Sequence, residues 1–432
     1  PRSSSAASDV YKRQVRERHN IVWTFKGIFL ALIKSTNKLP KNVDILFFCH
    51  DVHRHVKKNG KMYAPLLDPI IEEIEQDNEC FTLASPFSKL SGKKCFGKVD
   101  IHNSFIIFAL LKRFFLNFSL KLMNVDNDPL IKGYEKIFKK IEPKKILAIQ
   151  PSIELCIAAK KMNIKTFDVQ HGIITDVNYY NLSKRHSFNQ LGWPDYILCW
   201  DKESELRLKR LTDNKVNSKV IGHPSYHSGY GYLERENFQR KNNFKNLSIK
   251  KKILVSLTYL DYGVDHEDSY YKEIGIPKEL VLLIKNTSEF EWHLRMHPVQ
   301  LKYSHKRISK YLKNLFSNNK NVYWEEPSKT SLSQALFASV GHITVESATA
   351  LDAAQNSVPT ILIGCPGVSN RNKADLYFKE YLDKKIMKFV DSKDVSNLSL
   401  DFFLSEFDFH KKNKFLDEGN KNFKNFVEEL KN

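Results

Sequence analysis

Short apolar runs alternate with segments of helical periodicity along most of the chain. Residues 43–49 (VDILFFC) are almost wholly apolar and end at the polar pair His50 and Asp51. A continuous apolar run of this length is typical of a strand buried on both faces of a parallel sheet. Residues 65–74 (PLLDPIIEEI) then show the spacing of a helix that buries one face. The opening pattern therefore predicts a strand followed by a helix.

The same alternation recurs in two series. In the first, strands are predicted at 145–150, 165–169, 196–200 and 219–221, with a helix at 153–161. In the second, strands are predicted at 253–257, 291–296, 322–324, 342–345 and 360–363, with helices at 278–286, 303–315, 331–338 and 348–355. Strands separated by helices imply parallel sheets covered on both faces. The sequence therefore predicts an α/β chain of two tandem Rossmann-like, doubly wound domains.

Composition suggests where these domains begin and end. The chain has 432 residues, of which 42% are hydrophobic, and this length favours two domains over one. Residues 1–14 form a Ser/Ala-rich tract without periodicity, which we interpret as non-native or disordered, so that the natural N-terminus is expected to be missing. We expect an N-terminal domain at 15–235, a linker at 236–252, a C-terminal domain at 253–400, and a helical segment at 401–432 that packs across both domains.

Charge and cysteine content narrow the partners and the compartment. Sixty-eight Lys and Arg against 49 Asp and Glu give a net charge of +19, which attracts polyanions in general. The six cysteines form no CxxC pair, so we expect a reducing, cytoplasmic compartment and no structural zinc. Because no apolar run approaches the roughly 18 residues that a spanning helix needs, we also expect the chain not to cross a bilayer.

The polar residues that follow the predicted strands are the candidates for chemistry, because ligands bind at the carboxyl ends of strands in an open parallel sheet. Glu346, Ser347, Ala348 and Thr349 follow the strand at 342–345 and open a helix. Their hydroxyls, backbone N–H groups and helix N-terminus suit a phosphate. The alternative is that Ser347 is simply an N-cap.

A second candidate is Arg295, with His297 and Pro298, directly after the strand at 291–296. A cation and an imidazole at a strand end can contact an anionic leaving group, although a histidine in a surface turn is the plainer interpretation.

The third candidate is Gln170, His171 and Gly172, after the strand at 165–169. Gly172 would let a ligand approach the backbone, and His171 can accept a proton near neutral pH. A turn or capping role for His171 is equally natural.

The fourth candidate is His50 and Asp51, near His53 and His55. Their spacing matches no familiar metal-ligand pattern, so we expect a solvated loop and no metal. The chain also lacks GxxxxGK[ST], a GxGxxG after a strand, and GxSxG. P-loop NTPases, dinucleotide oxidoreductases and α/β-hydrolases are thereby disfavoured.

Taken together, several short motifs resemble the GT-B glycosyltransferases of bacterial surface polysaccharide synthesis. They are the segments 168–172 (DVQHG), 194–200 (PDYILCW), 220–224 (VIGHP), 295–298 (RMHP), 345–348 (VESA) and 358–360 (VPT). Within that fold the chain is most similar to the capsule polysaccharide and CDP-glycerol glycerophosphotransferase-like group. The same HP and serine pairing also resembles that of bacterial sialyl- and Kdo-transferases, which use CMP-sugars. Two departures are Glu346-Ser347-Ala348, where the family has paired serines, and Gln170 before the histidine-glycine pair, where an aromatic is frequent.

The resemblance implies roles for individual residues. His297 and Ser347, with Glu346 and Thr349, would hold the phosphates of a nucleotide-activated donor, while Arg295, Pro298 and Ala348 complete that site. His171 would act as general base, and the cleft candidates are Gln170, Gly172, Gly222, His50 and Asp51. The reaction implied is a single displacement with inversion, without metal or other cofactor.

The expected partners follow from the same resemblance. They are a nucleotide-sugar donor and an anionic glycan or lipid-linked acceptor at the inner membrane face, the latter drawn to Lys112, Arg113 and Lys121. That basic stretch is also compatible with a core helix that has snorkelling lysines.

Other functions stay open at this point. A CDP-glycerol-type glycerophosphotransferase and a non-hydrolysing sugar-nucleotide epimerase use the same fold, and Glu346 keeps the epimerase in consideration. A non-catalytic scaffold that binds the donor is a further alternative. We expect no nucleic-acid partner, because the Lys and Arg residues are scattered over helices rather than interleaved with aromatics on one face.

Overall fold

The computed structural model describes most of the chain. The described residues are 38–54, 56–84, 88, 90, 92–97, 99–102, 107–109, 111–113, 128–174, 189–228, 251–258, 268–345, 347–356, 358–365, 371–383, 387–399, 403 and 409–432. The tract at 1–14, most of the expected linker at 236–252, and the residues His55, Lys121 and Glu346 lie outside them. The chain divides into two compact units, residues 1–229 with Lys421–Asn432, and residues 230–420.

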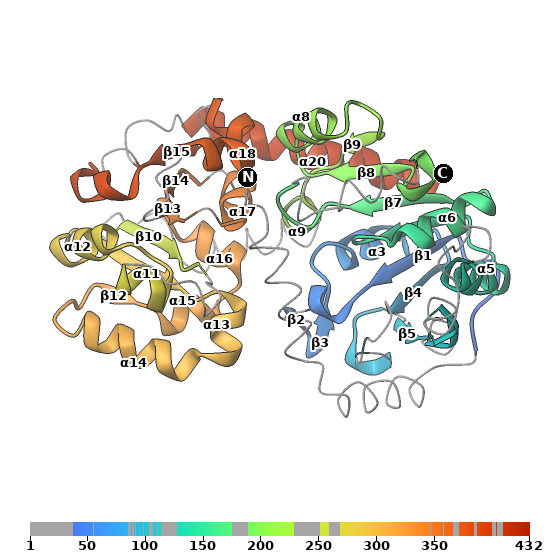
Figure 1. The fold of residues 1–432 in the computed structure, drawn as a ribbon, viewed down its shortest axis with the longest axis horizontal. Helices are drawn as coiled ribbons and strands as arrows, with labels where there is room; N and C mark the ends of the chain where they lie inside the picture. Colours follow the sequence, from blue (N-terminus) through green and yellow to red (C-terminus); the bar gives the residue numbers. More distant parts are fainter. Residues whose placement is uncertain are drawn as a thin grey trace. The chain divides into compact units, whose positions relative to one another are not determined.

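Unit 1 is built on a seven-stranded parallel sheet with the strand order β5-β4-β1-β6-β7-β8-β9 (Figure 1). Its strands are β1 (Ile45–Cys49), β4 (Cys80–Ala84), β5 (Val99–Ile101), β6 (Lys145–Ala148), β7 (Lys165–Val169), β8 (Tyr196–Cys199) and β9 (Ser218–Val220). Its helices are α3 (Asp68–Ile74), α5 (Pro129–Ile141), α6 (Ile153–Lys161), α8 (Lys202–Leu211) and α9 (Pro224–His227). Unit 1 also contains short 3-10 helices (η1, Asp51–His53; η2, Gly92–Lys94; η4, Asn189–Gly192) and the antiparallel pair β2 (Val56–Lys58) and β3 (Lys61–Tyr63).

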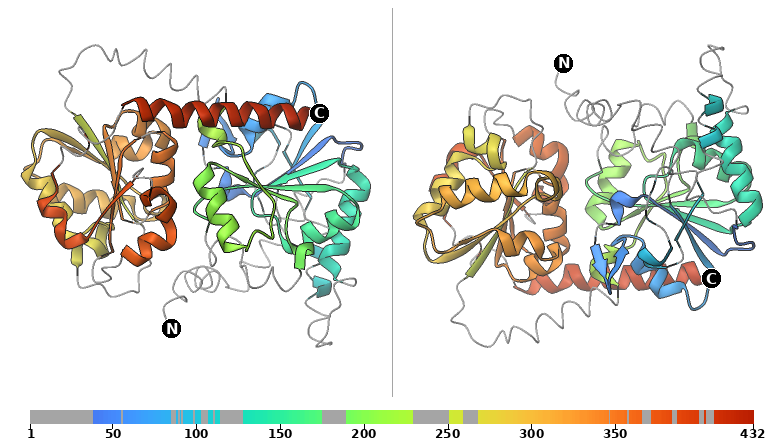
Figure 2. Two further views of the ribbon diagram at one scale, coloured as in Figure 1. Left: turned by 90° about the horizontal axis from the view of Figure 1, so that it is seen from above. Right: turned by 90° about the horizontal axis from the view of Figure 1, so that it is seen from below.

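The strand β1 shows why its sequence is apolar at every position. Leu46 and Phe48 pack with α5 and α6, whereas Ile45, Phe47 and Cys49 pack on the other face with α3 and the end of the C-terminal helix. Successive side chains of a strand point to opposite faces, so a strand covered on both sides must be apolar throughout. All five residues are at most 4% exposed. Figure 2 shows helices on both faces of each sheet.

Unit 2 contains a six-stranded parallel sheet with the order β12-β11-β10-β13-β14-β15. Its strands are β10 (Lys251–Ser256), β11 (Phe290–Arg295), β12 (Val322–Tyr323), β13 (Gly341–Thr344), β14 (Thr360–Ile363) and β15 (Met387–Val390). Its helices are α11 (Ser269–Ile274), α12 (Lys278–Asn286), α13 (Pro298–Tyr303), α14 (His305–Leu315), α15 (Glu325–Lys329), α16 (Leu332–Phe337), α17 (Thr349–Gln355) and α18 (Arg371–Asp383), with the 3-10 helix η5 (Ser392–Asn397). The predicted pair of doubly wound α/β domains is confirmed.

The C-terminal helix α20 (Phe409–Lys431) ends in unit 1. Phe423, Phe426, Val427 and Leu430 are buried among the side chains of β1 and α3. Packing of this helix across both domains stays a prediction. In the part of the chain that the structure describes, no helix combines the length and the apolar character that a membrane span requires.

Candidate functional site

The carboxyl ends of β10 and β13 meet at the centre of the unit 2 sheet. The two strands are neighbours, yet the strands that follow them along the chain lie on opposite sides, which makes this the topological switch point where doubly wound sheets bind ligands. Thr258 Oγ1 donates a hydrogen bond to the carbonyl oxygen of Val345 over 2.9 Å. Gln300 Nε2 donates to the carbonyl oxygen of Thr258 over 3.3 Å. Segments after β10, β11 and β13 are therefore joined at one edge.

His297 is the N-cap of α13. Its Nδ1 accepts the N–H of Val299 (3.2 Å), while Gln300 Oε1 accepts the N–H of His297 (2.8 Å), which completes a capping box. Burial lowers the pKa of the His297 imidazole, so the ring is neutral at pH 7. Because Nδ1 is the acceptor, the proton of the neutral ring resides on Nε2, and His297 is a hydrogen-bond donor at that atom.

Arg295 ends β11 and contacts the backbone of a neighbouring helix. Its Nη1 donates to the carbonyl oxygens of Pro327 and Thr330, the latter over 2.6 Å, at the end of α15. These are carbonyls that a helix C-terminus leaves without partners, and a cation there also complements the helix dipole. The structure thus gives Arg295 an anchoring role. The predicted contact of its guanidinium with a phosphate stays a prediction.

The predicted hydroxyl cluster lies at the start of α17. Ser347 Oγ accepts the N–H of Thr349 over 3.4 Å, and Ala348 occupies the N-cap position without a side-chain cap. Thr349 Oγ1 is shielded from solvent and has no hydrogen-bond partner in the described structure. Pro298 is exposed at the first turn of α13. Ser347 therefore forms the capping-type contact that was its plainer interpretation, whereas the hydroxyl of Thr349 retains capacity for a ligand.

In unit 1, the turn after β7 is organised by a buried glutamine. Gln170 is 0% exposed, its Nε2 donates to the carbonyl of Gly172 (2.9 Å) and to Ser204 Oγ (3.1 Å), and its Oε1 accepts the N–H of Trp200 (2.8 Å). The side-chain amide of Gln170 therefore forms its hydrogen bonds within the protein, and these bonds fix the turn that carries His171. An aromatic residue at this position could not make these three hydrogen bonds.

His171 is half-buried, and burial lowers the pKa of its imidazole to about 4. The ring is therefore neutral at pH 7. The ring of His53 lies in an edge-on arrangement with that of His171, with their centroids 5.7 Å apart. His53 follows β1 and His171 follows β7, so two strand ends of the unit 1 sheet contribute to one cluster.

Two of the cleft candidates are glycines with different constraints. A Cβ added at Gly172 would meet nothing within 4 Å, and its backbone is not left-handed. Gly222 has φ +76°, a conformation that favours glycine, and it leads into His223. His223 repeats the arrangement of His297: it caps a helix that begins with proline, and its Nδ1 accepts the N–H of Ser225 over 3.2 Å.

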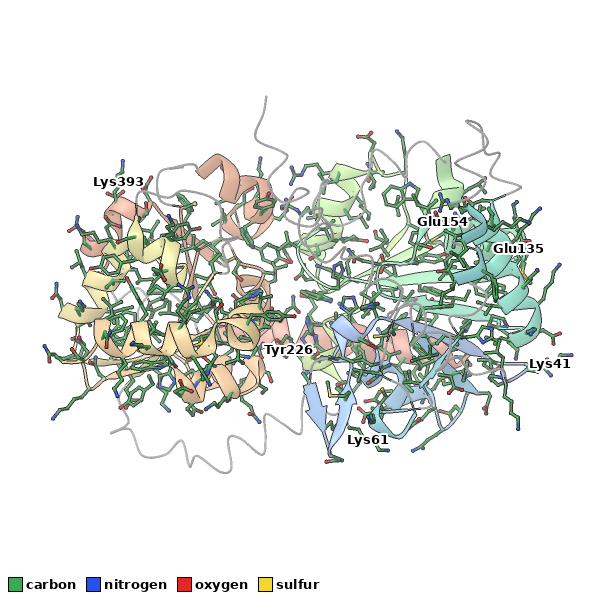
Figure 3. All side chains as sticks on the ribbon, turned by 60° about the horizontal axis from the view of Figure 1, so that its bottom comes forward. Lys41, Lys61, Glu135, Glu154, Tyr226 and Lys393 are labelled. Carbon is green, nitrogen blue, oxygen red and sulfur yellow. The ribbon has the colours of Figure 1, made fainter. Side chains whose placement is uncertain are left out.

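The rings of Trp200 and Tyr226 enclose His223, each with a centroid 4.2 Å from that of the imidazole (Tyr226 is labelled in Figure 3). Burial lowers the pKa of His223 well below its ordinary value. His223 is therefore a neutral core residue of unit 1.

The His50 and Asp51 candidates lie directly after β1. Both oxygens of the Asp51 carboxylate accept the N–H of Leu90 at 3.3 Å, and burial lowers the pKa of His50. Asp51 thus holds a neighbouring segment in place. Within the described residues, no three His, Cys, Asp or Glu side chains lie together as a metal site would require.

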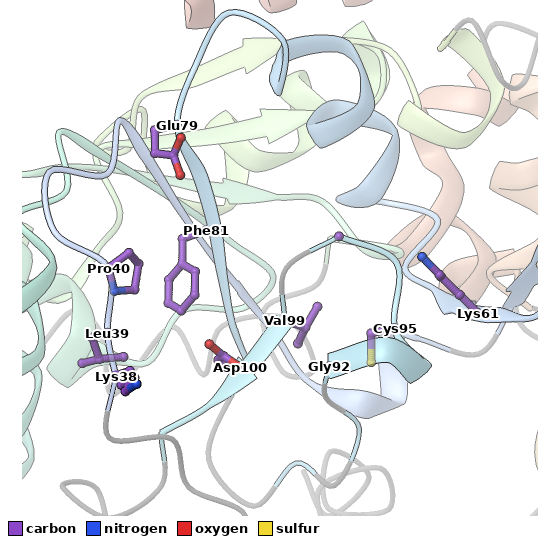
Figure 4. Close-up of a pocket in the computed structure, with 11 residues that line it drawn as sticks. Lys38, Leu39, Pro40, Lys61, Glu79, Phe81, Gly92, Cys95, Val99 and Asp100 are labelled. Carbon is purple, nitrogen blue, oxygen red and sulfur yellow. The ribbon is translucent and has the colours of Figure 1, made fainter.

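A shallow groove of about 640 Å³ opens elsewhere on unit 1 (Figure 4). It is lined by Lys38, Leu39, Pro40, Lys61, Glu79, Phe81, Gly92, Cys95, Gly97, Val99 and Asp100. None of the predicted site residues lines it.

Sequence reasoning missed Thr258 and Gln300. Thr258 directly follows the predicted strand at 253–257, so the rule that identified the other clusters would also have found it. Nothing in the sequence indicates that Gln300 belongs to this site, because its contact with Thr258 joins positions that are 42 residues apart.

Comparisons with known proteins give the fold its name. No protein-family model matches the chain, and no curated protein is significantly similar to it in sequence. Among solved structures, UDP-GlcNAc 2-epimerase from Neisseria meningitidis, bound to UDP-GlcNAc, has a TM-score of 0.53 at 12% identity, covering 89% of this chain and 98% of that one. UDP-GlcNAc 2-epimerase from Methanocaldococcus jannaschii has a TM-score of 0.52 at 15% identity, covering 88% and 98%.

The wall teichoic acid polymerase TagF is similar over the length of both chains. Its TM-score is 0.51 at 14% identity, and the match covers 98% of this chain and 97% of that one. At such identities the likeness is one of fold. The chain therefore has the two-domain GT-B fold that its motifs led us to expect.

Proposed function

We propose that this protein is a GT-B glycosyltransferase that moves a sugar, or a sugar-like group, from a nucleotide-activated donor to a glycan or lipid-linked acceptor of the cell surface. The observation that carries the proposal is the joined edge of unit 2. There the segments after β10, β11 and β13 are linked through Thr258, Gln300 and Val345, and His297 and Thr349 lie on two of these segments. A donor phosphate is the ligand that such hydroxyl and imidazole donors suit.

The state of His297 defines how it would act. The neutral ring donates from Nε2 to a phosphate oxygen, and its orientation is fixed by the Val299 N–H at Nδ1. The Thr349 hydroxyl donates to a second oxygen. Negative charge develops on the departing phosphate as its bond to the donor carbon breaks, so donors already in position stabilise the transition state. This proposal uses no metal.

The acceptor chemistry is assigned to unit 1. The acceptor hydroxyl loses its proton to the neutral imidazole of His171, its oxygen forms a bond to the donor carbon, and the nucleotide phosphate leaves with the bonding electron pair. The donor carbon is inverted in this single displacement. The buried amide of Gln170 holds the turn that carries His171.

Contact with a membrane face is part of the proposal and is supported by one exposed segment. Phe108 is 65% exposed and Leu111 is 41% exposed, and Lys112 beside them is exposed as well. An apolar and cationic surface of this kind suits the inner face of an anionic membrane. Arg113, by contrast, is paired with Glu154 over 2.8 Å (Figure 3 labels Glu154).

The direct test is a thermal-shift panel of CMP, CDP, UDP, GDP and dTDP. A ligand that binds only the folded state must raise its melting temperature. We expect one nucleotide to stabilise the wild type and to lose this effect in His297→Ala. A matched control is His305→Ala on α14, whose side chain contacts Glu325 rather than the joined edge. No shift with any nucleotide would contradict the proposal and favour a non-catalytic scaffold or a function that uses no nucleotide.

A sugar-nucleotide epimerase is the second candidate. It is favoured by the similarity to the two epimerase structures, one of which holds UDP-GlcNAc. A CDP-glycerol-type glycerophosphotransferase is favoured in the same way by the similarity to TagF. Incubation of nucleotide sugars without acceptor separates these possibilities, because an epimerase interconverts the donor alone, whereas either transferase requires an acceptor. CDP-glycerol with a glycerol-phosphate acceptor then distinguishes the two transferases.

A further inference from the structure

A buried arginine lies just beyond β1, in a part of unit 1 to which the proposed reaction assigns no role. Arg54 is 1% exposed, and Asp68, the first residue of α3, is 0% exposed. Arg54 Nη1 donates to Asp68 Oδ2 over 2.8 Å, and the same oxygen accepts the N–H of Ala64 over 2.7 Å. The carboxylate balances the guanidinium charge, which a buried cation requires.

This ion pair leaves hydrogen-bonding capacity unused on both partners. Arg54 Nε and Nη2 have no acceptor within the described structure, and Asp68 Oδ1 has no donor, although all three atoms are shielded from solvent. The Nε–H and Nη2–H groups lie along one edge of the planar guanidinium. That edge matches two oxygens of a phosphate or carboxylate in the bidentate geometry that arginine favours.

The position of Arg54 also points to a ligand. β1 lies between β4 and β6, and the strand order of the unit 1 sheet changes direction at β1. Ligands of doubly wound folds bind at such a topological switch point. His53 directly precedes Arg54, and its ring lies 5.7 Å from that of His171. An anion bound to Nε and Nη2 of Arg54 would thus be held beside the chain segment that contacts the proposed general base.

We propose that Arg54 binds an oxyanion, the phosphate or carboxylate of a small ligand, at the carboxyl end of β1. Nε and Nη2 donate to two of its oxygens, Nη1 stays with Asp68, and a protonated oxygen of a phosphate donates to Asp68 Oδ1. Identifying this anion with a charged group of the acceptor rests on the proposed function. The binding site itself does not.

Thermal shifts of the full chain in inorganic phosphate, against chloride at constant ionic strength, test the site. Each variant also carries His297→Ala, which keeps phosphate binding at the proposed donor site out of the signal. We expect the stabilisation by phosphate to be lost in Arg54→Lys, which keeps the charge but removes the bidentate edge. In Asp68→Asn the apparent Kd for phosphate is expected to fall about tenfold, because the competing carboxylate charge is gone.

Arg307→Met on α14 is the matched control, since Arg307 is exposed and lies in unit 2. It should respond to phosphate like its parent. Equal responses of all the variants would place the phosphate elsewhere on the basic surface and overturn the proposal. If Arg54→Lys does not fold, Asp68→Asn decides alone, and an unchanged Kd in that variant has the same consequence.

Further arms identify the source of the anion. Acetate in place of phosphate distinguishes a carboxylate from a phosphoryl ligand. Vesicles that contain phosphatidic acid, compared with soluble glycerol phosphate, distinguish a lipid headgroup from a free phosphate ester. Because none of these measurements uses nucleotide or activity, failure of the proposed transferase function would leave their outcome unaffected.

Discussion

Thr258 and Val345 hold the ends of two neighbouring strands together: the threonine hydroxyl donates to the valine carbonyl oxygen over 2.9 Å. These strands, β10 and β13, are where the chain reverses its order across the unit 2 sheet. The strands that come next along the chain, β11 and β14, lie on opposite sides of this pair, and the bond joins residues just after β10 and β13. The bond thereby couples the stability of unit 2 to the geometry of its candidate donor site.

Thr258→Val should lower the free energy of unfolding by about 1–3 kcal/mol, because it removes the donor from a carbonyl of a buried residue. Urea unfolding measures this change. The stabilisation by nucleotide should fall in parallel. Thr330→Val serves as control, since this exposed hydroxyl bonds only within its own helical turn, to Glu326. Equal losses in the two variants would contradict a special role for Thr258.

Much of the fold could be predicted because apolar runs on buried strands are distinctive. The predicted strand at 253–257 corresponds to β10 and the predicted strand at 360–363 to β14. The strands β4, β5 and β15 were missed. The edge strands β5 (VDI) and β15 (MKFV) are short and interrupted by a charged residue, and β4 (CFTLA) is a short run next to the edge. The predicted helix at 303–315 is α14, but the separate helix α13 before it was also missed. There His297 and Pro298 form a cap and first turn, a local geometry that periodicity does not reveal.

The candidate site was predictable only up to the strand ends. Position after a strand identified His171, His297 and Ser347, because parallel strands bring their carboxyl ends to one edge. Position after a strand could not show that the Gln170 amide forms hydrogen bonds with backbone groups, or that Arg295 donates to the carbonyls at the end of α15. The partners of Gln170 at Trp200 and of Arg295 at Thr330 are 30 and 35 residues away along the chain, and contacts over such separations leave no local pattern in the sequence.

Gly275→Ala should be strongly destabilising. Gly275 ends α11 with φ +74°, and an added Cβ would lie 1.9 Å from the carbonyl oxygen of Thr258. Backbone on both sides cannot yield as a side chain can, so we expect a loss of more than about 3 kcal/mol, or failure to fold. Chemical denaturation, or the soluble yield where the variant does not fold, provides the measurement. Wild-type stability would show that the turn can rearrange.

Gly172→Ala is expected to leave the free energy of unfolding within about 0.5 kcal/mol of the wild type, because the new methyl group meets nothing in the chain. Its use is functional. If a ligand approaches the backbone beside His171, acceptor-dependent turnover should fall while stability and nucleotide binding stay unchanged. Unaltered turnover would remove Gly172 from the candidate site.

His342 links three strands of unit 2 through its imidazole. Thr360 Oγ1 donates to the Val358 carbonyl, so the 3.3 Å contact requires His342 Nδ1 to carry the proton, and Nε2 accepts from Ser256 Oγ over 3.0 Å. Burial lowers the pKa of His342 to about 3, consistent with this neutral form.

Ser256→Ala should therefore cost about 1–3 kcal/mol, by leaving a buried acceptor unmet. His342→Leu removes that acceptor. A double-mutant cycle by urea unfolding should show that the two losses do not add, because both variants break the same bond. Strictly additive losses would mean that the contact between Ser256 and His342 contributes nothing to stability.

The low pKa of His171 predicts how stability responds to acid. Its folded-state pKa of about 4 lies below the roughly 6.5 of an exposed histidine, so the unfolded chain takes up the proton first as the pH falls. The contribution is fully present above pH 6.5 and declines between pH 6.5 and 4, at about 1.4 kcal/mol for each pKa unit. Unfolding free energies at pH 7.5 and 4.5 should accordingly differ less in His171→Gln than in the wild type. The other titrating groups are common to both proteins, so they cancel in this comparison.

An NMR titration of the His171 imidazole should give a midpoint near 4, and activity that depends on this base should persist well below pH 6.5. A midpoint at 6.5 would show that the ring is solvated and that the turn fixed by Gln170 does not shield it.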